Sequence, residues 1–541
     1  MIQALVENPI LLLFIVASIG YLLGTVKIGG NALGVAAVLF TGLAFGAMSD
    51  EFEIPSIVFN LGLVLFVYSI GLSSGPAFFK SYMKNGLRDF AFITSMLILS
   101  GLIAVALFMI MGMSASTITG IYSGSTTNTP ALAGVIDYIN NCFGRAGDDM
   151  VNQAVIGYSL SYPMGVLGGI IAILLMEKWL KIDYEEERKK IRKEYPSDKH
   201  LSSATILITN SALNGKTIRD ISKDKAWDVV FGRIVKGDSV SLATWDTEVQ
   251  TGDIIMLVGA KEELDLATED LGVPASSHLE YDRSQFDVRR IFVSNPDVVG
   301  HKLSTLNLAK DYNAVVSRIR RGDQDMLATD DTVLELGDRI RFIARREDLR
   351  ALSTYFGDSY YASSKVNIFS FGLGIGLGLV LGMIDLPLGG NFSFKLGYAG
   401  GPLIVGLLLG AARRTGPLVW TLPYSTTITL QQIGLILLLA GIGVNSGSSF
   451  ANSLNVDAIW IILASVIISL CTALAILWIG YKMVKLPFSL LMGMVSNQPA
   501  ILDFALNKSG NQIPQYGYTM MFPIAAVMKI IIAQVMFLVL S

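Results

Sequence analysis

The segment Ser123-Gly-Ser-Thr-Thr-Asn-Thr-Pro130 interrupts an otherwise apolar stretch that runs from Ser114 to Ile136. A second apolar stretch, Pro487 to Leu506, is interrupted in the same way by Ser496-Asn-Gln-Pro499. Turn-forming polar residues in the middle of an apolar stretch predict two short helices joined by a break. Because non-helical backbone survives at membrane depth only where protein or water satisfies it, both stretches are predicted to be re-entrant hairpins that line a pathway.

The composition of the whole chain indicates a polytopic α-helical membrane protein. Of its 541 residues, 52% are hydrophobic and only 16% are charged, which is too apolar for a soluble protein of this length. Cys142 and Cys471 lack the spacing of a disulfide framework, so a secreted disulfide scaffold is excluded as well. Runs that approach the roughly 20 residues of a spanning helix predict ten crossings, at Pro9 to Val26, Ala32 to Met48, Ile54 to Ile70, Phe90 to Met111, Val151 to Trp179, Val366 to Ile384, Leu396 to Ala412, Ile428 to Val444, Ala458 to Tyr481 and Tyr516 to Leu540.

Charged residues divide the chain into domains, because most of them lie between Glu177 and Lys365. The predicted domains are a membrane half at 1–180, a charged helical linker at 181–200, soluble modules at 201–275 and 284–360, and a second membrane half at 365–541. Cytoplasmic loops collect Lys and Arg near helix ends. This rule predicts that both termini lie outside and that residues 181–365 are cytoplasmic.

The two membrane halves repeat each other in sequence, with the matches in the same order. The matching pairs are Gly71 to Phe78 with Gly443 to Phe450, Asn128 to Leu132 with Asn497 to Ile501, Tyr158 to Pro163 with Tyr518 to Pro523, and Gly42 and Gly46 with Gly406 and Gly410. Five crossings in the first half would give the second half the opposite orientation. This is the inverted-repeat plan of secondary transporters, which bind substrate near the bilayer midplane at interrupted helices.

The soluble insert is itself duplicated, at an offset of about 85 residues. Arg233-Ile-Val-Lys-Gly-Asp238 aligns with Arg318-Ile-Arg-Arg-Gly-Asp323, and Gly252-Asp253 aligns with Gly337-Asp338. Alternating short strands and helices predict two small α+β modules. The strands are expected at Ala204 to Ile208, Asp253 to Val258, Ile291 to Val293 and Arg339 to Ile343.

The tips of the two predicted hairpins supply the first candidate binding residues. Backbone N–H groups at the start of a helix, with hydroxyl and amide side chains, suit the charged ends of a small zwitterion or dicarboxylate. The alternative is a kinked helix with a Ser/Thr-rich turn. The candidate residues are Ser125, Thr126, Thr127, Asn128, Thr129 and Pro130 in the first tip, and Ser496, Asn497, Gln498 and Pro499 in the second.

A second candidate set lies at two predicted helix ends, where Gly and Pro would unwind the helix and free backbone carbonyls for a substrate amine or a cation. The alternative is an ordinary helix end at the membrane surface with no role in binding. This set comprises Ser73, Ser74, Gly75 and Pro76 in the first half, with Asn445 and Ser446 in the second.

Lys529 is the third candidate, because it lies well inside an apolar helix, Ala525-Ala-Val-Met-Lys-Ile-Ile-Ile-Ala-Gln534. A charge there costs several kcal/mol unless it is compensated, and ionisable residues inside the membrane usually mark pathways. Lys529 could neutralise a substrate carboxylate or pair with Asp503, and the alternative is a structural or snorkelling lysine.

Motifs for other functions are weak or absent from the sequence. The three histidines, His200, His278 and His301, have no metal-ligand spacing, so no metal or other cofactor is predicted. The sequence contains no Walker loop, and no set of acid, base and nucleophile indicates an enzyme. A pI of about 5.8 does not indicate nucleic-acid binding.

Three motifs resemble the aspartate:alanine exchanger family of bacterial membrane antiporters. They are Gly71-Leu-Ser-Ser-Gly-Pro-Ala-Phe-Phe79, Gly124-Ser-Thr-Thr-Asn-Thr-Pro-Ala-Leu-Ala-Gly134 and Ile513-Pro-Gln-Tyr-Gly-Tyr518, and they flank two modules that resemble TrkA C-terminal (RCK C) domains. The resemblance implies a homodimer in the bacterial inner membrane that works as an elevator and exchanges external aspartate for internal alanine. Ser73, Ser74, Gly75, Pro76 and the positions Thr127 to Pro130 carry over from the family motifs, whereas Lys529 does not.

The sequence is also compatible with two other functions. Other members of the family resemble carboxylate exporters, so a succinate-like dicarboxylate is an alternative substrate. The RCK C-like modules also suggest a ligand-gated potassium channel or uptake subunit, although no Thr-Val-Gly-Tyr-Gly filter occurs. The modules could bind a regulatory small molecule or only stabilise the dimer, and the sequence does not separate these roles.

Overall fold

The structure is a computed structural model that describes residues 2–28, 31–32, 34–84, 86–184, 186–187, 201–225, 227–276, 279, 285–322, 324–364, 366–389, 392–452, 457–496, 499–511 and 513–541. The chain folds into two compact units. The membrane unit comprises Met1–Tyr195, Ile368–Ala412 and Thr427–Ser541. The insert unit comprises Pro196–Asn367 and Arg413–Thr426. Most of the predicted linker at 181–200 lies outside the described residues.

The membrane unit is helical, and its elements follow the same order in both halves of the sequence. The first half contains α1 (Ile2–Val6), α2 (Pro9–Thr25), the β1–β2 hairpin (Lys27–Ile28 and Asn31–Ala32), α3 (Ala37–Gly46), α4 (Ser56–Lys84), α5 (Gly86–Met111), α6 (Ala115–Ser125), α7 (Thr129–Phe143) and α8 (Asp148–Leu180). The second half contains α15 (Ile368–Met383), the β12–β13 hairpin (Asp385–Gly389 and Phe392–Lys395), α16 (Gly397–Ala412), α17 (Tyr424–Asn452), α18 (Asp457–Ile479), α19 (Phe488–Val495), α20 (Pro499–Ser509) and α21 (Ile513–Leu540). The pairs α6/α7 and α19/α20 lie where the sequence predicts interrupted helices.

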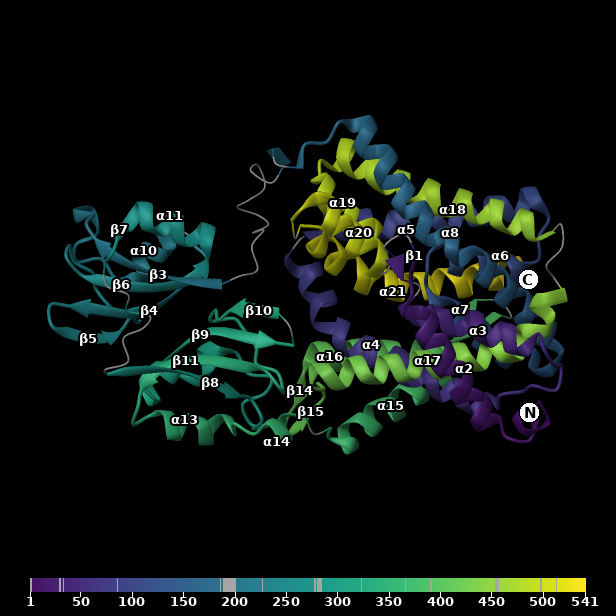
Figure 1. The fold of residues 1–541 in the computed structure, drawn as a ribbon, viewed down its shortest axis with the longest axis horizontal. Coiled ribbons are helices and arrows are strands. Elements are labelled where there is room, and N and C mark those ends of the chain that lie inside the picture. Colours follow the sequence, from purple (N-terminus) through teal and green to yellow (C-terminus); the bar gives the residue numbers. More distant parts are fainter. Residues whose placement is uncertain are drawn as a thin grey trace. The chain divides into compact units, whose positions relative to one another are not determined.

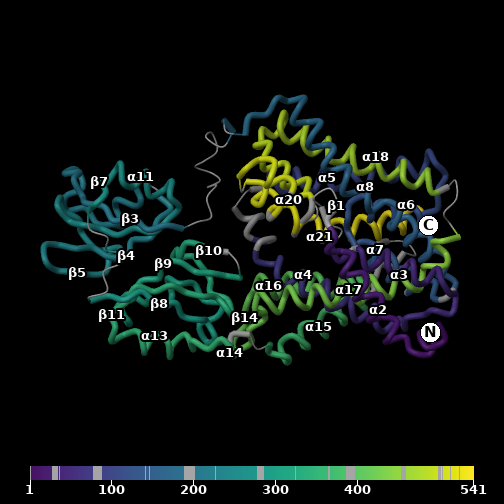
Figure 2. Tube along the Cα trace, in the orientation of Figure 1, coloured from purple at the N-terminus to yellow at the C-terminus, as the bar shows by residue number. Residues whose placement is uncertain are grey.

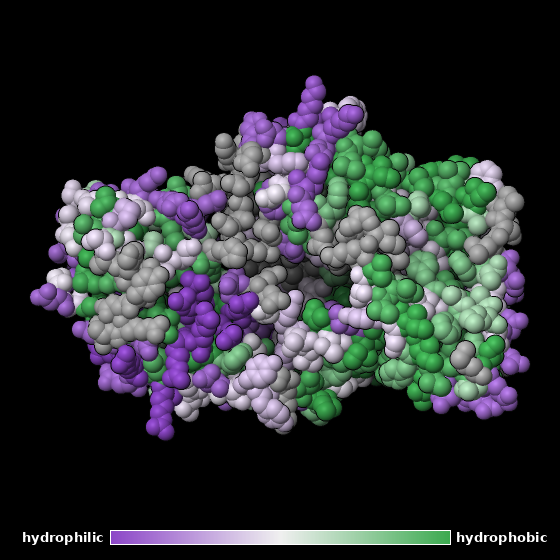
Figure 3. Space-filling view, viewed as in Figure 1, coloured by the Kyte–Doolittle hydropathy of each residue, from purple (hydrophilic) through white to green (hydrophobic). Residues whose placement is uncertain are grey.

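Five helices among the described residues are long and apolar enough to span a bilayer, namely α4, α5, α8, α17 and α18. The bent helix α21 adds a sixth if it counts as one span. The other four predicted crossings fall on the shorter apolar helices α2, α3, α15 and α16, so ten crossings stay a prediction. Large apolar side chains such as Leu102, Ile110 and Trp460 are exposed on these helices, and Figure 3 shows hydrophobic residues over much of the membrane unit.

Helix α21 occupies the middle of the membrane unit, between α8 and α18 on one side and α4 and α16 on the other (Figure 1). Around it, glycines let helices from the two halves cross in direct contact. A Cβ atom on Gly42 of α3 would lie 3.0 Å from the Cα of Gly443 on α17. Reciprocally, a Cβ atom on Gly71 of α4 would lie 3.0 Å from the Cα of Gly406 on α16, which runs beside α4 in Figure 2. These four glycines are the positions that the sequence comparison of the halves paired.

The insert unit contains two β-sheets, and four strands of the first sheet recur in the second at an offset of 85 residues. The first sheet has the order β5-β4-β6-β3-β7 and the second has the order β10-β9-β11-β8. Strand bounds are β3 (Leu201–Ile208), β4 (Val229–Lys236), β5 (Ser239–Leu242), β6 (Ile254–Ala260), β7 (Gly272–Pro274), β8 (Phe286–Phe292), β9 (Ala314–Arg321), β10 (Gln324–Leu327) and β11 (Arg339–Arg345). The helices are α10 (Ile218–Lys225), α11 (Lys261–Leu271), α12 (Leu308–Asp311), α13 (Leu349–Phe356) and α14 (Tyr360–Ser364). The four predicted strands are present, whereas β4, β5, β7, β9 and β10 were not predicted from the sequence.

The segment that joins α16 to α17 packs against the second module of the insert unit. It forms a hairpin of β14 (Arg414–Thr415) and β15 (Leu418–Val419). The Arg414 guanidinium donates to the Val299 carbonyl oxygen at 3.0 Å and lies 2.8 Å from Nε2 of His301. Val419 belongs to the hydrophobic core of this module. The insert unit therefore includes the segment that precedes α15 and the segment that follows α16.

Candidate functional site

The first helix break is built by a Schellman motif at the end of α6. The Thr127 amide donates to the Gly124 carbonyl oxygen and the Asn128 amide donates to that of Ser123, both at 2.8 Å. This arrangement needs a left-handed residue, and Thr127 occupies that position with a φ of 49°. A β-branched residue there is strained by about 1–3 kcal/mol, which makes the turn a candidate functional feature.

Lys529 reaches this turn from α21. Its side chain is 2% exposed, and its Nζ donates a hydrogen bond of 3.0 Å to the backbone carbonyl oxygen of Thr126. Thr126 caps the carboxyl end of α6, where helix carbonyls carry a partial negative charge that an ammonium group stabilises. The structure therefore brings together Lys529 and the first hairpin tip, two candidates that the sequence argument identified separately. The contact with Thr126 was not predicted, and the side chain of Asp503, which the sequence offers as a partner of Lys529, lies outside the described residues.

The start of α7 offers fewer free amides than the sequence argument expected. Asn128 is its N-cap, and the Asn128 Oδ1 accepts a hydrogen bond of 2.8 Å from the Ala131 amide. Pro130 has no N–H to offer. The Thr129 hydroxyl lies 2.7 Å from the hydroxyl of Tyr158, a buried residue of α8. Groups of the chain itself thus take up part of the hydrogen-bonding capacity at the start of α7. Hydroxyl groups, rather than backbone amides, are therefore the better candidates for binding a substrate at this tip.

Two hydroxyl groups in the break have no hydrogen-bond partner within the described part of the chain. They are the buried Oγ of Ser125 and the buried Oγ1 of Thr127. Leaving a buried polar group unpaired costs about 1–3 kcal/mol, so each such group in a native fold needs an explanation. A small polar substrate or water molecules in the break would supply the missing partners.

Asp137 on α7 and Gln534 on α21 are two buried polar residues that the sequence argument missed. The Asp137 Oδ2 accepts a hydrogen bond of 2.7 Å from the Tyr398 amide in the first turn of α16. Gln534 Nε2 donates to the Gly134 carbonyl oxygen of α7 at 3.0 Å. The sequence could have pointed to both residues, because each is a polar side chain inside an apolar helix, where polar groups mark interfaces or pathways. Both residues tie α7 to helices of the second half.

The second helix break is described only in part. Ser496 is buried and its Oγ donates to the Met492 carbonyl oxygen at 2.7 Å, at the end of α19. Asn497, Gln498 and the side chain of Pro499 lie outside the described residues, so their predicted role stays a prediction.

At the other end of α19, the carboxylate of Glu187 accepts hydrogen bonds from the backbone amides of Phe488 and Ser489, the latter at 3.0 Å. A carboxylate is favourable at a helix N-terminus, where the backbone N–H groups are unpaired. The segment that leaves the membrane unit after α8 thereby caps the second interrupted helix. The sequence argument missed this contact, because Glu187 and α19 are distant in the chain.

The prediction of two unwound helix ends was wrong for the Ser-Gly motifs of α4 and α17. Ser73, Ser74, Gly75 and Pro76 lie inside the continuous helix α4, and Asn445 and Ser446 lie inside the continuous helix α17. The glycines permit close packing instead of unwinding: a Cβ atom on Gly75 would lie 2.8 Å from the backbone nitrogen of Ala411 on α16.

The side chains of these motifs also have local partners. The exposed Ser73 donates to the Ile70 carbonyl oxygen at 3.1 Å and accepts from Gln431 Nε2 at 3.2 Å. Asn445 pairs with both backbone polar groups of Ile54, at 2.8 and 2.9 Å. Ser74 and Ser446 are buried. A role of these residues in substrate binding stays a prediction, but freed helix carbonyls no longer support it.

Within the described ranges, no group of three or more His, Cys, Asp or Glu side chains could hold a metal ion. The candidate site is therefore the break between α6 and α7 together with Lys529. It combines the buried Lys529 ammonium, a helix carboxyl end and two hydroxyl groups that have no hydrogen-bond partner among the described residues. Such a set can bind a small anion or zwitterion inside a helical membrane unit, which is the kind of site that a permease needs.

Known proteins match the chain over its full length. The family model described as Predicted Permease Membrane Region matches residues 12–178 and 370–538, and the TrkA-C domain model matches residues 288–357. The chain belongs to this permease family, the aspartate:alanine exchanger family, and carries a TrkA-C domain. It is a multi-pass membrane transporter.

Three relatives carry the description uncharacterized transporter. One from Geobacter sulfurreducens is 45% identical and covers 99% of both chains. One from Symbiobacterium thermophilum is 42% identical over 100% of both chains, and one from Corynebacterium diphtheriae is 39% identical over 99% of both. The crystal structure of the GsuK RCK domain matches at 11% identity with a TM-score of 0.16, covering 30% of this chain and 65% of that chain.

Proposed function

We propose that the protein is a secondary antiporter that exchanges small amino acids or carboxylates, with L-aspartate entering and L-alanine leaving the cell. The family membership supports transport of this class. The observation that carries the proposal is the buried ammonium group of Lys529 at the break between α6 and α7, next to the unpartnered hydroxyls of Ser125 and Thr127.

A single fixed positive charge suits this substrate pair. Aspartate carries two carboxylates and one ammonium group at neutral pH, whereas alanine carries one of each. The side-chain carboxylate of aspartate would form an ion pair with Lys529, and alanine lacks this carboxylate. Exchange of the two substrates then moves one net charge across the membrane in each cycle, so the proposed transport is electrogenic.

The arrangement of the two halves supports alternating access by an elevator-like movement. Elements occur in the same order in both halves, and the reciprocal contacts of Gly42 with Gly443 and of Gly71 with Gly406 are those of a pseudo-two-fold relation. In this proposal the halves have opposite orientations, the termini face outward, and residues 181–365 are cytoplasmic. The protein works as a homodimer in the bacterial inner membrane.

Uptake of labelled L-aspartate into proteoliposomes tests the proposal. The vesicles are preloaded with L-alanine, L-aspartate, succinate, potassium or buffer alone. We expect uptake that requires internal alanine or aspartate, and we expect an imposed membrane potential to change its rate. Flux with succinate alone would assign a dicarboxylate exporter. A potassium conductance without organic flux would replace the antiporter by a channel.

A further inference from the structure

The insert unit contains a cavity of about 550 Å³ between its two modules. Both copies of the internal repeat contribute residues to its lining. Ile218, Thr244 and Trp245 of the first module line one wall, and the positions 85 residues later, Leu303, Thr329 and Asp330, line the other. Equivalent positions of the two modules therefore line the cavity from both sides.

Packing between the modules holds the cavity open. Met256 and Val258 of the first module share a buried hydrophobic cluster with Phe286 and Ile343 of the second. Arg318 on β9 donates to the Leu201 carbonyl oxygen of the first module at 3.0 Å. A cavity supported in this way is preformed, as most small-molecule sites are.

Four polar side chains of the cavity wall, those of Trp227, Thr244, Thr329 and Asp331, have hydrogen-bond or ion-pair partners. The Thr244 and Thr329 hydroxyls lie 3.0 and 2.9 Å from the hydroxyls of Thr247 and Thr332. Trp227 Nε1 donates to Asp270 at 3.1 Å.

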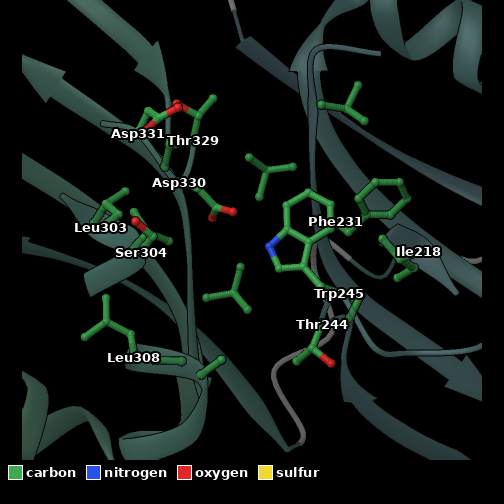
Figure 4. Close-up of a pocket in the computed structure, with 18 of the residues that line it drawn as sticks. Ile218, Phe231, Thr244, Trp245, Leu303, Ser304, Leu308, Thr329, Asp330 and Asp331 are labelled. Atoms are coloured by element: carbon green, nitrogen blue, oxygen red, sulfur yellow. The ribbon is translucent and has the colours of Figure 1, made fainter. Parts of the chain in front are cut away.

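The carboxylate of Asp331 forms an ion pair of 2.7 Å with Lys302. In the part of the chain that the structure describes, the side chains of Trp245 and Asp330 have no such partner. These two residues occupy equivalent positions in the repeat, and Figure 4 shows the indole and the carboxylate projecting into the same space from opposite modules.

The chemistry of these two groups defines a ligand. An indole face stacks on flat rings and attracts cations, and Trp245 is 42% exposed, so its face is accessible. Asp330 accepts hydrogen bonds from an amine. Of the charged residues in the wall, three are acidic (Asp228, Asp330 and Asp331) and one is basic (Lys310). Because Asp331 is paired with Lys302, the wall keeps an excess of one negative charge, which disfavours phosphates and carboxylates.

We propose that the cavity binds a planar aromatic or heteroaromatic amine, stacked on Trp245 and hydrogen-bonded to Asp330. This site is separate from the transport site, since it lies wholly in the insert unit. It also departs from the symmetry of the repeat, because the aromatic group and the carboxylate come from different modules. A ligand with one flat end and one cationic end matches that asymmetry.

Isothermal titration calorimetry on the purified full-length protein tests the site. The probes are tryptamine and 2-aminobenzimidazole, with indole-3-acetate as an anion that has the same ring as tryptamine. We expect saturable binding of at least one amine at one site per chain, and weaker binding of indole-3-acetate. Trp245→Ala and Asp330→Asn should each weaken amine binding by about tenfold, and Trp245→Phe should restore part of the loss.

The matched control is Trp460→Ala, which removes an exposed indole from α18 of the membrane unit and should leave amine binding unchanged. Absence of saturable binding by either amine would overturn the proposal. So would binding that is equally strong in the wild-type protein, Trp245→Ala and Asp330→Asn. Aspartate exchange plays no part in this measurement, so the outcome is independent of the proposed transport function.

Discussion

Two stretches of similar composition behave differently in the membrane unit. Ser73-Ser-Gly-Pro76 lies inside the continuous helix α4, whereas Ser123-Gly-Ser-Thr-Thr-Asn-Thr-Pro130 separates α6 from α7. Serine, glycine and proline thus do not break a membrane helix by themselves. The difference shows that a break requires partners for the backbone groups that it frees.

The neighbouring helices explain the difference. Along α4, Gly75 packs against the backbone of α16, and a continuous helix keeps its own hydrogen bonds. Where α6 ends, the backbone groups that lose their helical partners find other hydrogen bonds. These are supplied by the Schellman motif, the Asn128 cap and the Lys529 ammonium group.

Replacement of Lys529 by alanine should have the largest effect, the loss of most aspartate–alanine exchange with the fold retained. The change removes the site's buried positive charge and leaves the Thr126 carbonyl without its partner, at a cost of about 1–3 kcal/mol. Counterflow in proteoliposomes measures the loss. The control is Lys508→Ala, which removes a partly exposed lysine that pairs with Glu177 at 3.2 Å. Near-normal exchange by Lys529→Ala would remove Lys529 from the site.

Gly75→Leu should destabilise the membrane unit, because a side chain at this position meets the backbone of α16. Overpacking of this kind costs about 1–3 kcal/mol or more. The thermal unfolding midpoint in detergent should fall. Gly372→Leu is the matched control, since no atom lies within 4 Å of a Cβ placed on this glycine of α15. If the two variants are equally stable, close packing does not explain why α4 stays continuous.

Asn128→Leu should raise the apparent substrate constant of exchange. The change removes the N-cap of α7, worth about 1 kcal/mol, and disturbs the turn that presents Ser125 and Thr127. Asn8→Leu is a suitable control, because Asn8 caps α2 through a hydrogen bond of 3.1 Å to the Leu11 amide. Loss of that cap should cost stability without changing the substrate constant. Asn497→Leu extends the test to the second break, and unchanged constants in both would make the breaks structural only.

Ser73→Ala should have the smallest effect on exchange. The Ser73 hydroxyl bonds to the Ile70 carbonyl oxygen of its own helix and to Gln431, and the side chain is exposed. Its removal deletes local hydrogen bonds without unpairing a buried group. A loss of exchange comparable to that of Lys529→Ala would instead place Ser73 in the substrate site, as the family motif implies.

Several features of the fold could be predicted because they depend on local sequence. Asn128 and Pro130 are ordinary signals for a helix start, and the polar run before them marks the end of α6. The repeat of 85 residues in the insert predicted two small α+β modules, and the structure shows that their sheets have corresponding strand orders. The continuity of α4 was missed, because Pro76 is a breaking signal whose effect depends on the helices around it.

The sequence by itself determined which segments are apolar enough for a membrane, where two of the helices are interrupted, and that both the membrane halves and the insert modules are repeated. Hydropathy, turn chemistry and periodicity are properties of neighbouring residues, so a single chain displays them. Only the tertiary structure decided that Lys529 bonds to Thr126, that Asp137 meets the start of α16, and that Trp245 faces Asp330. These contacts join residues far apart in the chain, and their energies depend on burial and direction that no local pattern encodes.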